Sequence, residues 1–134
     1  MSREVVRTDK APAAAGPYSQ GIKANGFIFV AGQGGIVPGT KGPIEGGIQA
    51  QTRQTFENIK AILEAAGTSL DNVVKMNVYL PDIGDFAAMN AVDASCFGAE
   101  PPARTAAPAA ASRWAMARRF AAWRRRQSGA ALGS

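Results

Sequence analysis

The chain has 134 residues, of which 46% are hydrophobic and 19% are charged, a composition typical of one folded domain and not of a disordered chain. It contains no histidine and a single cysteine, Cys96, which excludes an internal disulfide, a thiol metal cluster and histidine acid–base chemistry. No apolar run reaches the roughly 18 residues of a membrane span, and the first residues lack the apolar core of a secretion signal. We therefore expect a cytoplasmic protein with no membrane partner.

The formal net charge of +5 is unevenly distributed along the chain. Residues 1–104 carry nine basic and ten acidic side chains, whereas residues 105–134 carry six arginines and no acidic side chain. The body of the domain therefore lacks the excess of positive charge that nucleic-acid binding requires. We expect no nucleic-acid partner for it.

The first predicted elements are two short strands, near residues 19–24 and 27–32. They are separated by Asn25-Gly26, and Asn-Gly is the strongest short signal for a hairpin because both central positions of a tight type I′ turn need positive φ. The glycine- and proline-rich segment GGIVPGTKGP that follows predicts a loop.

The pattern after residue 44 predicts a helix, a strand and a second helix. Spacings of three and four predict the first helix, which ends before Gly67 and whose apolar stripe holds Ile48, Thr52, Thr55, Phe56, Ile59, Ile62, Leu63 and Ala66. Residues 73–80 alternate and predict a half-buried strand. Asp82 to Asp85 give capping signals for the second helix, on which the recurring positions are Phe86, Met89, Val92, Asp93, Cys96 and Phe97. We interpret Cys96 as an inert core thiol.

The order β-β-α-β-α predicts an α+β sandwich, in which a mixed sheet carries both helices on one face. A sheet of three strands is barely wide enough to cover the buried faces of two helices. The fold therefore needs further strands after residue 105. The residues available there are rich in alanine, a weak strand former, and include Pro108, which lacks a backbone donor. We therefore divide the chain into a domain, 1–105, and an atypical Ala/Arg-rich tail, 106–134, and expect the closing strands to be absent or altered.

Two interpretations of the tail are open. Trp and Met each have a single codon, so Trp114 and Met116 fix part of the nucleotide sequence. When this stretch is read one base earlier, it encodes an apolar-Gly-Asp-Gly type of turn, which would suit the link between two strands. One hypothesis is therefore that the tail is a frame-shifted translation. Alternatively, Met116, Phe120 and Trp123 recur at i, i+4 and i+7 among arginines. That spacing is typical of a basic amphipathic helix, which binds nucleic acid or an anionic membrane.

Five segments of residues 8–105 together resemble the RidA family, also called YjgF-type reactive-intermediate deaminases or endoribonuclease L-PSP proteins. In chain order they are APAAAGPYSQGI, FIFVAGQGG, QAQTRQTFENIKAILEAAGTSLDNVVKMNVYL, DFAAMNAV and PPART. The resemblance implies a chorismate-mutase-like α+β fold and a homotrimer with clefts between subunits. It also implies a 2-iminobutanoate/2-iminopropanoate deaminase, which produces the 2-keto acid and ammonia and uses neither a metal nor a cofactor.

The resemblance assigns site roles to Arg104, Tyr18, Gly32, Gln33 and Asn90. A planar guanidinium binds a carboxylate through two parallel hydrogen bonds, so Arg104 would orient the 2-imino acid. Tyr18 would close the pocket, and backbone groups near Gly32, which has no side chain, would contact the imine nitrogen or the attacking water. Structural roles are the alternatives: a surface arginine at 104, a packing aromatic at 18, backbone geometry at 32, and capping or solvent exposure at 90.

The chain departs from the family after PPART. The family places a glutamate, which is taken to activate water, on a later strand, whereas this chain has no acidic residue after Glu100. Glu45, Glu57 and Glu64 fit solvated helix faces and are not candidates to replace it. Activity would then be impaired. Two other functions stay open: an RNA-binding, endoribonuclease or translation-inhibitor protein that uses the basic tail, and a non-catalytic trimeric sensor of small 2-keto acids.

Overall fold

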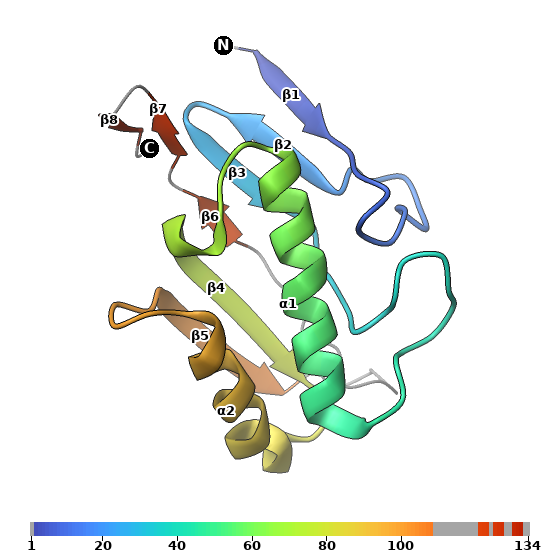
Figure 1. Cartoon of the computed structure of the whole chain (residues 1–134). Helices are drawn as coiled ribbons and strands as arrows, with labels where there is room; N and C mark the ends of the chain where they lie inside the picture. The colour runs from blue at the N-terminus through green and yellow to red at the C-terminus, as the bar shows by residue number, and fades with distance from the viewer. Residues whose placement is uncertain (1, 109–120, 124, 128–129, 133–134) are drawn as a thin grey trace.

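The computed structural model describes residues 2–108, 121–123, 125–127 and 130–132. Its elements in chain order are β1 (Arg3–Val6), β2 (Gly21–Ala24), β3 (Phe27–Val30), α1 (Gly47–Ala65), η1 (Leu70–Asn72), β4 (Val73–Leu80), η2 (Ile83–Asp85), α2 (Phe86–Cys96), β5 (Ala103–Pro108), β6 (Ala121–Trp123), β7 (Arg125–Gln127) and β8 (Ala130–Leu132) (Figure 1).

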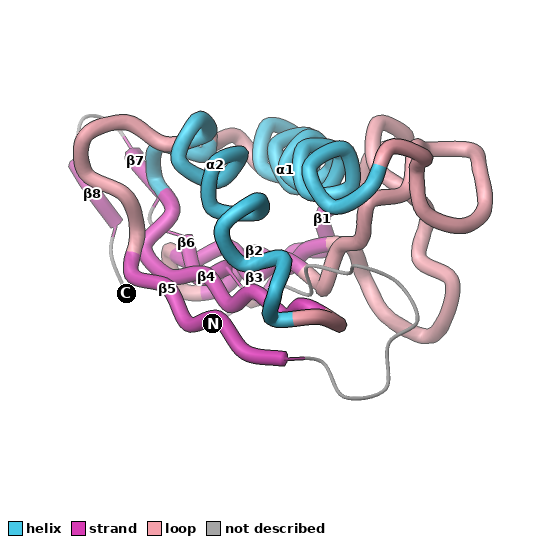
Figure 2. Tube along the Cα trace, turned by 90° about the horizontal axis from the view of Figure 1, so that it is seen from below, coloured by secondary structure: helices cyan, strands magenta, loops and turns pink. Residues whose placement is uncertain are grey.

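Six strands form one mixed sheet in the spatial order β1-β2-β3-β6-β4-β5, and β7 and β8 form a separate two-stranded ribbon. Strands β4 and β5 run parallel, and the other neighbours in the large sheet are antiparallel. Helices α1 and α2 lie on the same side of this sheet (Figure 2). The predicted α+β class, with a mixed sheet and two helices on one face, is confirmed.

The hairpin between β2 and β3 forms where Asn25-Gly26 predicts it. Asn25 has φ 52° and Gly26 has φ 81°, the positive values that a tight hairpin turn requires. Strand β1, which pairs with β2 at the sheet edge, is an addition to the predicted order. It has four residues and buries only Val6, so it carries no alternation that could reveal it.

The closing strands are present in altered form. Strand β5 begins at Ala103 and continues to Pro108, so it crosses the predicted boundary at residue 105. It lies at the edge of the sheet, where a proline at the strand end is tolerated. Strand β6 has three residues and pairs with both β3 and β4.

The two interpretations of the tail fall mostly outside the described residues. The codon argument concerns Trp114 and Met116, and the proposed helix begins at Met116; both lie in the segment 109–120, outside those residues. Residues 121–123 form strand β6. The prediction that the helix reaches Trp123 is therefore wrong.

The main core lies between α1 and the sheet, as the predicted apolar stripe requires. Phe56, Ile59, Ile62 and Leu63 of α1 are at most 2% exposed and pack against sheet residues that include Ile28, Val30 and Met76. A second cluster, formed by Val78, Leu80 and Met89, lies under α2. Among the described residues, no helix is both long enough and apolar enough to cross a membrane.

The loop between β3 and α1 is fixed against the helix at two points. The side-chain amide of Asn58 donates to the carbonyls of Gly34 and Ile36, at 3.1 and 2.8 Å. Between them, Gly35 lies so close to α1 that a Cβ there would be 2.7 Å from the Cα and the carbonyl oxygen of Gln51. Glycine is therefore required at position 35 by the approach of two backbones.

We predict that Gly35→Ala destabilises the protein, because backbone atoms of α1 cannot yield as a side chain can, and overpacking costs about 1–3 kcal/mol. The thermal unfolding midpoint should fall by several degrees. Gly98→Ala is the matched control, since a Cβ at position 98 has no atom within 4 Å. Equal midpoints for the two variants would contradict the close approach.

Candidate functional site

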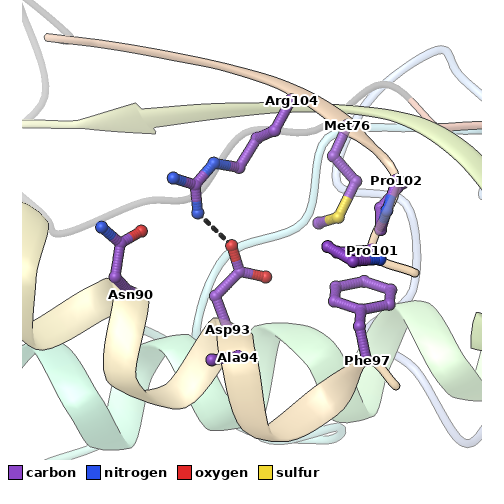
Figure 3. A pocket seen from close by; sticks show the side chains of 8 residues that line it. All are labelled: Met76, Asn90, Asp93, Ala94, Phe97, Pro101, Pro102 and Arg104. Atoms are coloured by element: carbon purple, nitrogen blue, oxygen red, sulfur yellow. Dashed lines mark hydrogen bonds and ion pairs between the residues drawn. The ribbon is translucent and has the colours of Figure 1, made fainter. Parts of the chain in front are cut away.

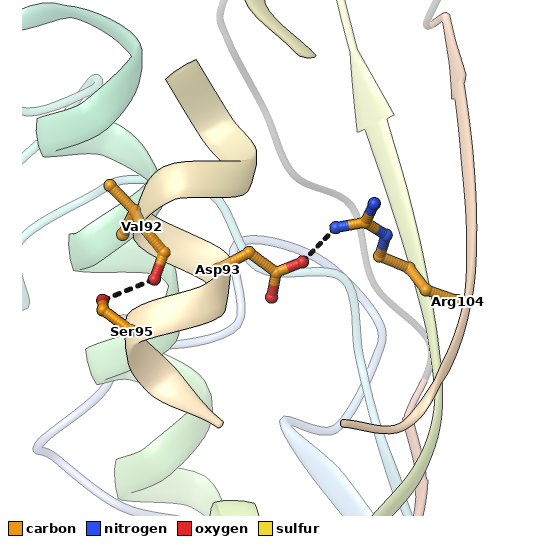
Figure 4. Close-up of polar contacts among 4 residues, drawn as sticks. All are labelled: Val92, Asp93, Ser95 and Arg104. Atoms are coloured by element: carbon orange, nitrogen blue, oxygen red, sulfur yellow. Dashed lines mark hydrogen bonds and ion pairs between the residues drawn. The ribbon is translucent and has the colours of Figure 1, made fainter. Parts of the chain in front are cut away.

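Arg104, the second residue of β5, directs its guanidinium toward α2. Its Nη1 donates to Oδ2 of Asp93 on α2 (Figure 4). The guanidinium carbon also lies 5.3 Å from the centre of the Phe86 ring at the start of α2. The Arg104 side chain is 26% exposed and that of Asp93 is 9% exposed. One helix therefore holds the guanidinium by an ion pair and by a cation–π contact.

The ion pair lines a cavity of about 400 Å³ between α2 and the start of β5 (Figure 3). Its walls are formed by Met76, Asn90, Asp93, Ala94, Phe97, Pro101, Pro102 and Arg104. Arg104 is the one cation and Asp93 the one anion among these residues. A second cavity is lined by Ile83, Phe86, Arg104 and Ala106. Arg104 thus contributes to the walls of two cavities.

Local sequence explains how these side chains come together. Asn90 and Asp93 are three residues apart on α2, so they project from the same face of the helix, one turn apart. Pro101-Pro102 restricts the chain before β5 to extended backbone. The strand then pairs in parallel with β4, with Arg104 opposite Met76. Arg104 is therefore placed on the helix side of the sheet.

Two oxygen atoms of this site are buried and accept no hydrogen bond from the residues that the structure describes. They are Oδ1 of Asp93 and Oδ1 of Asn90. Leaving a buried acceptor unsatisfied costs about 1–3 kcal/mol, so such atoms are rare in folded proteins and call for an explanation, such as a bound water or a ligand. In Figure 3, Asn90 and Asp93 project from helix α2 on one side of the cavity, and Arg104 faces them from the other side.

The structure brings together two of the five predicted site residues. Arg104 and Asn90 line the same cavity. Tyr18 lines a different one, near the N-terminal loop, is 50% exposed, and accepts a hydrogen bond from the backbone of Ala15 through its hydroxyl. Gly32 is exposed and Gln33 is buried, and neither is among the residues that line the Arg104 cavity. Their roles remain predictions.

Asp93 is the site residue that the sequence analysis missed. Its position fits the apolar stripe of α2, so the pattern places it toward the core without assigning a function. A signal was present in the residue type, because a carboxylate is almost never buried unless it is paired. A buried Asp one turn after Asn90 therefore indicated that a cation had to face this part of the helix.

The described part of the chain contains no group of three or more His, Cys, Asp or Glu side chains close enough to hold a metal ion together. The polar groups of the Arg104 cavity are one guanidinium, one carboxylate and one amide. Such a set is chemically suited to a small organic molecule that carries both an anionic group and hydrogen-bond donors.

Comparison with known proteins assigns the chain to a family. Residues 8–117 match the family model described as Endoribonuclease L-PSP. A RutC family protein of Pyrococcus abyssi is 56% identical over 106 residues, which cover 79% of this chain and 84% of that protein. The chain belongs to the RidA family. The match to this family extends past residue 105, so part of the segment assigned to the tail is included in it.

Two further RidA-family relatives bear on fold and activity. The crystal structure of RidA from the Antarctic bacterium Psychrobacter sp. PAMC 21119 is similar with a TM-score of 0.81 and 44% sequence identity, over 89% of this chain and 96% of that chain. A mouse protein named 2-iminobutanoate/2-iminopropanoate deaminase is 40% identical over 109 residues, 81% of each chain. The chorismate-mutase-like fold of the family is confirmed.

The ion pair should contribute measurably to stability. In Arg104→Met the Asp93 carboxylate stays buried without a cation, and we expect the free energy of unfolding to fall by about 2–3 kcal/mol. The double variant Arg104→Met/Asp93→Leu removes the isolated charge and should recover most of that loss, because an apolar pair of similar size replaces a partly buried ion pair at little cost. Urea denaturation measures both. A double variant no more stable than Arg104→Met would contradict the pairing.

Proposed function

We propose that this RidA-family protein hydrolyses small 2-imino acids, such as 2-iminobutanoate and 2-iminopropanoate, to the 2-keto acid and ammonia. The observation that carries the proposal is the guanidinium of Arg104 in a cavity wall. Only its Nη1 has a partner among the described residues, so Nε and Nη2 are available to bind a substrate carboxylate in a two-point contact. The name of the mouse relative supports the same chemistry.

The reaction needs only substrate and water. The oxygen of water bonds to C2 of the imino acid, and the C=N double bond becomes a single bond. The C–N bond then breaks as the C2–oxygen bond becomes a carbonyl, and the two protons of the water leave on the nitrogen as ammonia. Arg104 fixes the carboxylate next to C2, which orients the reacting carbon in the cavity. Because imines already hydrolyse readily in water, orientation alone gives a useful acceleration.

The first test is a coupled assay. Threonine dehydratase generates 2-iminobutanoate, and semicarbazide traps whatever imine the protein has not hydrolysed. We expect Arg104→Ala to lower kcat/KM by about 100-fold, since the lost hydrogen bonds join charged partners. Arg53→Ala, at an exposed position of α1, should leave the rate unchanged.

Two outcomes of this assay would reject the proposal. Ligand binding without ammonia release would favour the alternative of a non-catalytic sensor. An Arg104→Ala variant as active as the unaltered protein would show that the substrate does not use this guanidinium.

We propose further that the protein acts as a homotrimer, through the sheet face opposite the helices. This face exposes apolar side chains: Val5 is 42% and Phe29 is 46% exposed. Val5, Ile22 and Phe29 lie side by side on three neighbouring strands because they are register partners. An apolar strip of this kind on a sheet is typical of an interface. The occupant that fits it is a second copy, which carries the same strip.

Assembly also supplies a reason for the position of Tyr18. Within one chain its ring is half exposed and belongs to a cavity that does not include Arg104. We propose that the ring of one subunit closes the Arg104 cavity of the next, together with backbone groups near Gly32 and Gln33. The complete site would then lie between subunits.

The trimer proposal predicts that Phe29→Glu gives monomers, because a charge would have to be buried in each interface. Size-exclusion chromatography with light scattering measures the mass. Ala65→Glu, at an exposed position of α1, is the control and should remain trimeric. A monomeric unaltered protein would reject the trimer, and a trimeric Phe29→Glu variant would reject this face as its interface.

The RNA-directed alternative has less support. It depends on arginines after residue 105, whose side chains lie outside the described residues, whereas residues 1–104 have one more acidic than basic side chain. The cytoplasmic location stays a prediction from the sequence.

A further inference from the structure

The cavity beside Arg104 is electrically balanced before any ligand enters. Its eight lining residues include one cation, Arg104, and one anion, Asp93, which pair with each other. A ligand that brings only a carboxylate would add a net negative charge next to Asp93. A ligand that brings both a carboxylate and a positive nitrogen would leave the charge balanced.

The buried acceptors of this cavity indicate where the positive nitrogen binds. The Asp93 side chain is 9% exposed. Its Oδ2 accepts a hydrogen bond from Arg104, whereas its Oδ1 is buried and has no hydrogen-bond partner among the described residues. Oδ1 of Asn90, one turn earlier on α2, is also buried and without a hydrogen-bond partner among the described residues. The side chains of the lining residues carry hydrogen-bond donors only on Arg104 and on the Asn90 amide. A ligand nitrogen that carries hydrogen can supply the donors that these two oxygens lack.

We propose that Asp93, assisted by Asn90, binds the nitrogen of the ligand, so that the cavity selects zwitterionic 2-amino and 2-imino acids over 2-oxo acids. The inference rests on the proposed role of Arg104 in binding the carboxylate. In a 2-amino or 2-iminium acid, one carbon separates the carboxylate from the nitrogen. The direct contact between Arg104 and Asp93 places a carboxylate-binding group beside a nitrogen-binding group, as this short spacing requires.

This selection separates substrate from product. Hydrolysis replaces a nitrogen that donates hydrogen bonds by a carbonyl oxygen that only accepts them. The product then sets an acceptor against Oδ1 of Asp93 and leaves the buried oxygens without donors. Sites built to bind an N–H discriminate strongly against an analogue that lacks it, for this reason. The 2-oxo acid therefore leaves, while the 2-imino acid is held.

The test measures binding without turnover. The probes are L-2-aminobutanoate, a stable ammonium analogue, and 2-oxobutanoate, which has the same carbon skeleton; calorimetry or NMR titration gives both dissociation constants. We expect the unaltered protein to bind 2-aminobutanoate at least about tenfold more tightly, the ratio given by one charge-assisted hydrogen bond. In Asp93→Asn the ratio should fall to about twofold or invert, since the amide keeps the shape but removes the negative charge.

Controls separate the possible failures. Asp71→Asn, at an exposed position of η1, should keep the full preference. If circular dichroism shows that Asp93→Asn does not fold, Asn90→Ala provides the second variant and should reduce the preference several-fold. Equal affinities in the unaltered protein, or an unchanged preference in the folded variant, would overturn the role of Asp93. If neither probe binds, or if Arg104→Ala binds both as well as before, the carboxylate site fails, and the proposed function fails with it.

Discussion

The contact between Arg104 and Asp93 joins the edge strand β5 to helix α2 and determines the chemistry of the cavity between them. A guanidinium on the helix side of a sheet is costly to desolvate unless an anion faces it. Asp93 supplies that anion, and the Phe86 ring covers one face of the guanidinium. The pair uses one nitrogen of Arg104 and one oxygen of Asp93, and in the proposed site the remaining guanidinium donors and the second oxygen bind the ligand. In that proposal, one ion pair serves both packing and recognition.

Sequence patterns predicted the elements whose signals are local. The positive φ values of Asn25 and Gly26, the stripe of α1 and the alternation of β4 each depend on residues close in sequence. Strands β1 and β6 have four and three residues, too few for a period to be recognised. Strand β6 is also held by β3 and β4, which are far away along the chain, so pairing overrides the weak strand propensity of alanine.

The site residues also fall into those that local sequence motifs indicate and those that depend on distant parts of the chain. Arg104 and Asn90 were found because their motifs resemble those of a known family, and they do line one cavity. Asp93 was hidden because hydrophobic periodicity reports only which face of a helix is buried. The role of Asp93 depends on strand β5, which begins ten residues later and places Arg104 opposite the carboxylate. Tyr18, Gly32 and Gln33 lie apart from the cavity within one chain, so only an assembly of chains could join them to it.

No acidic residue follows Glu100, so the glutamate that the family resemblance led us to expect as the activator of water is missing. The proposed site offers another way to promote the same reaction. Hydrolysis of an imine accelerates when the nitrogen is protonated, since the iminium carbon is the stronger electrophile. An anion beside that nitrogen favours the protonated form. Asp93 is the one carboxylate among the residues that line the cavity, and its free oxygen is buried, where such an interaction is strongest. In the proposed arrangement, Arg104 holds the acid group and Asp93 activates the electrophile, so that water can attack without a strong base.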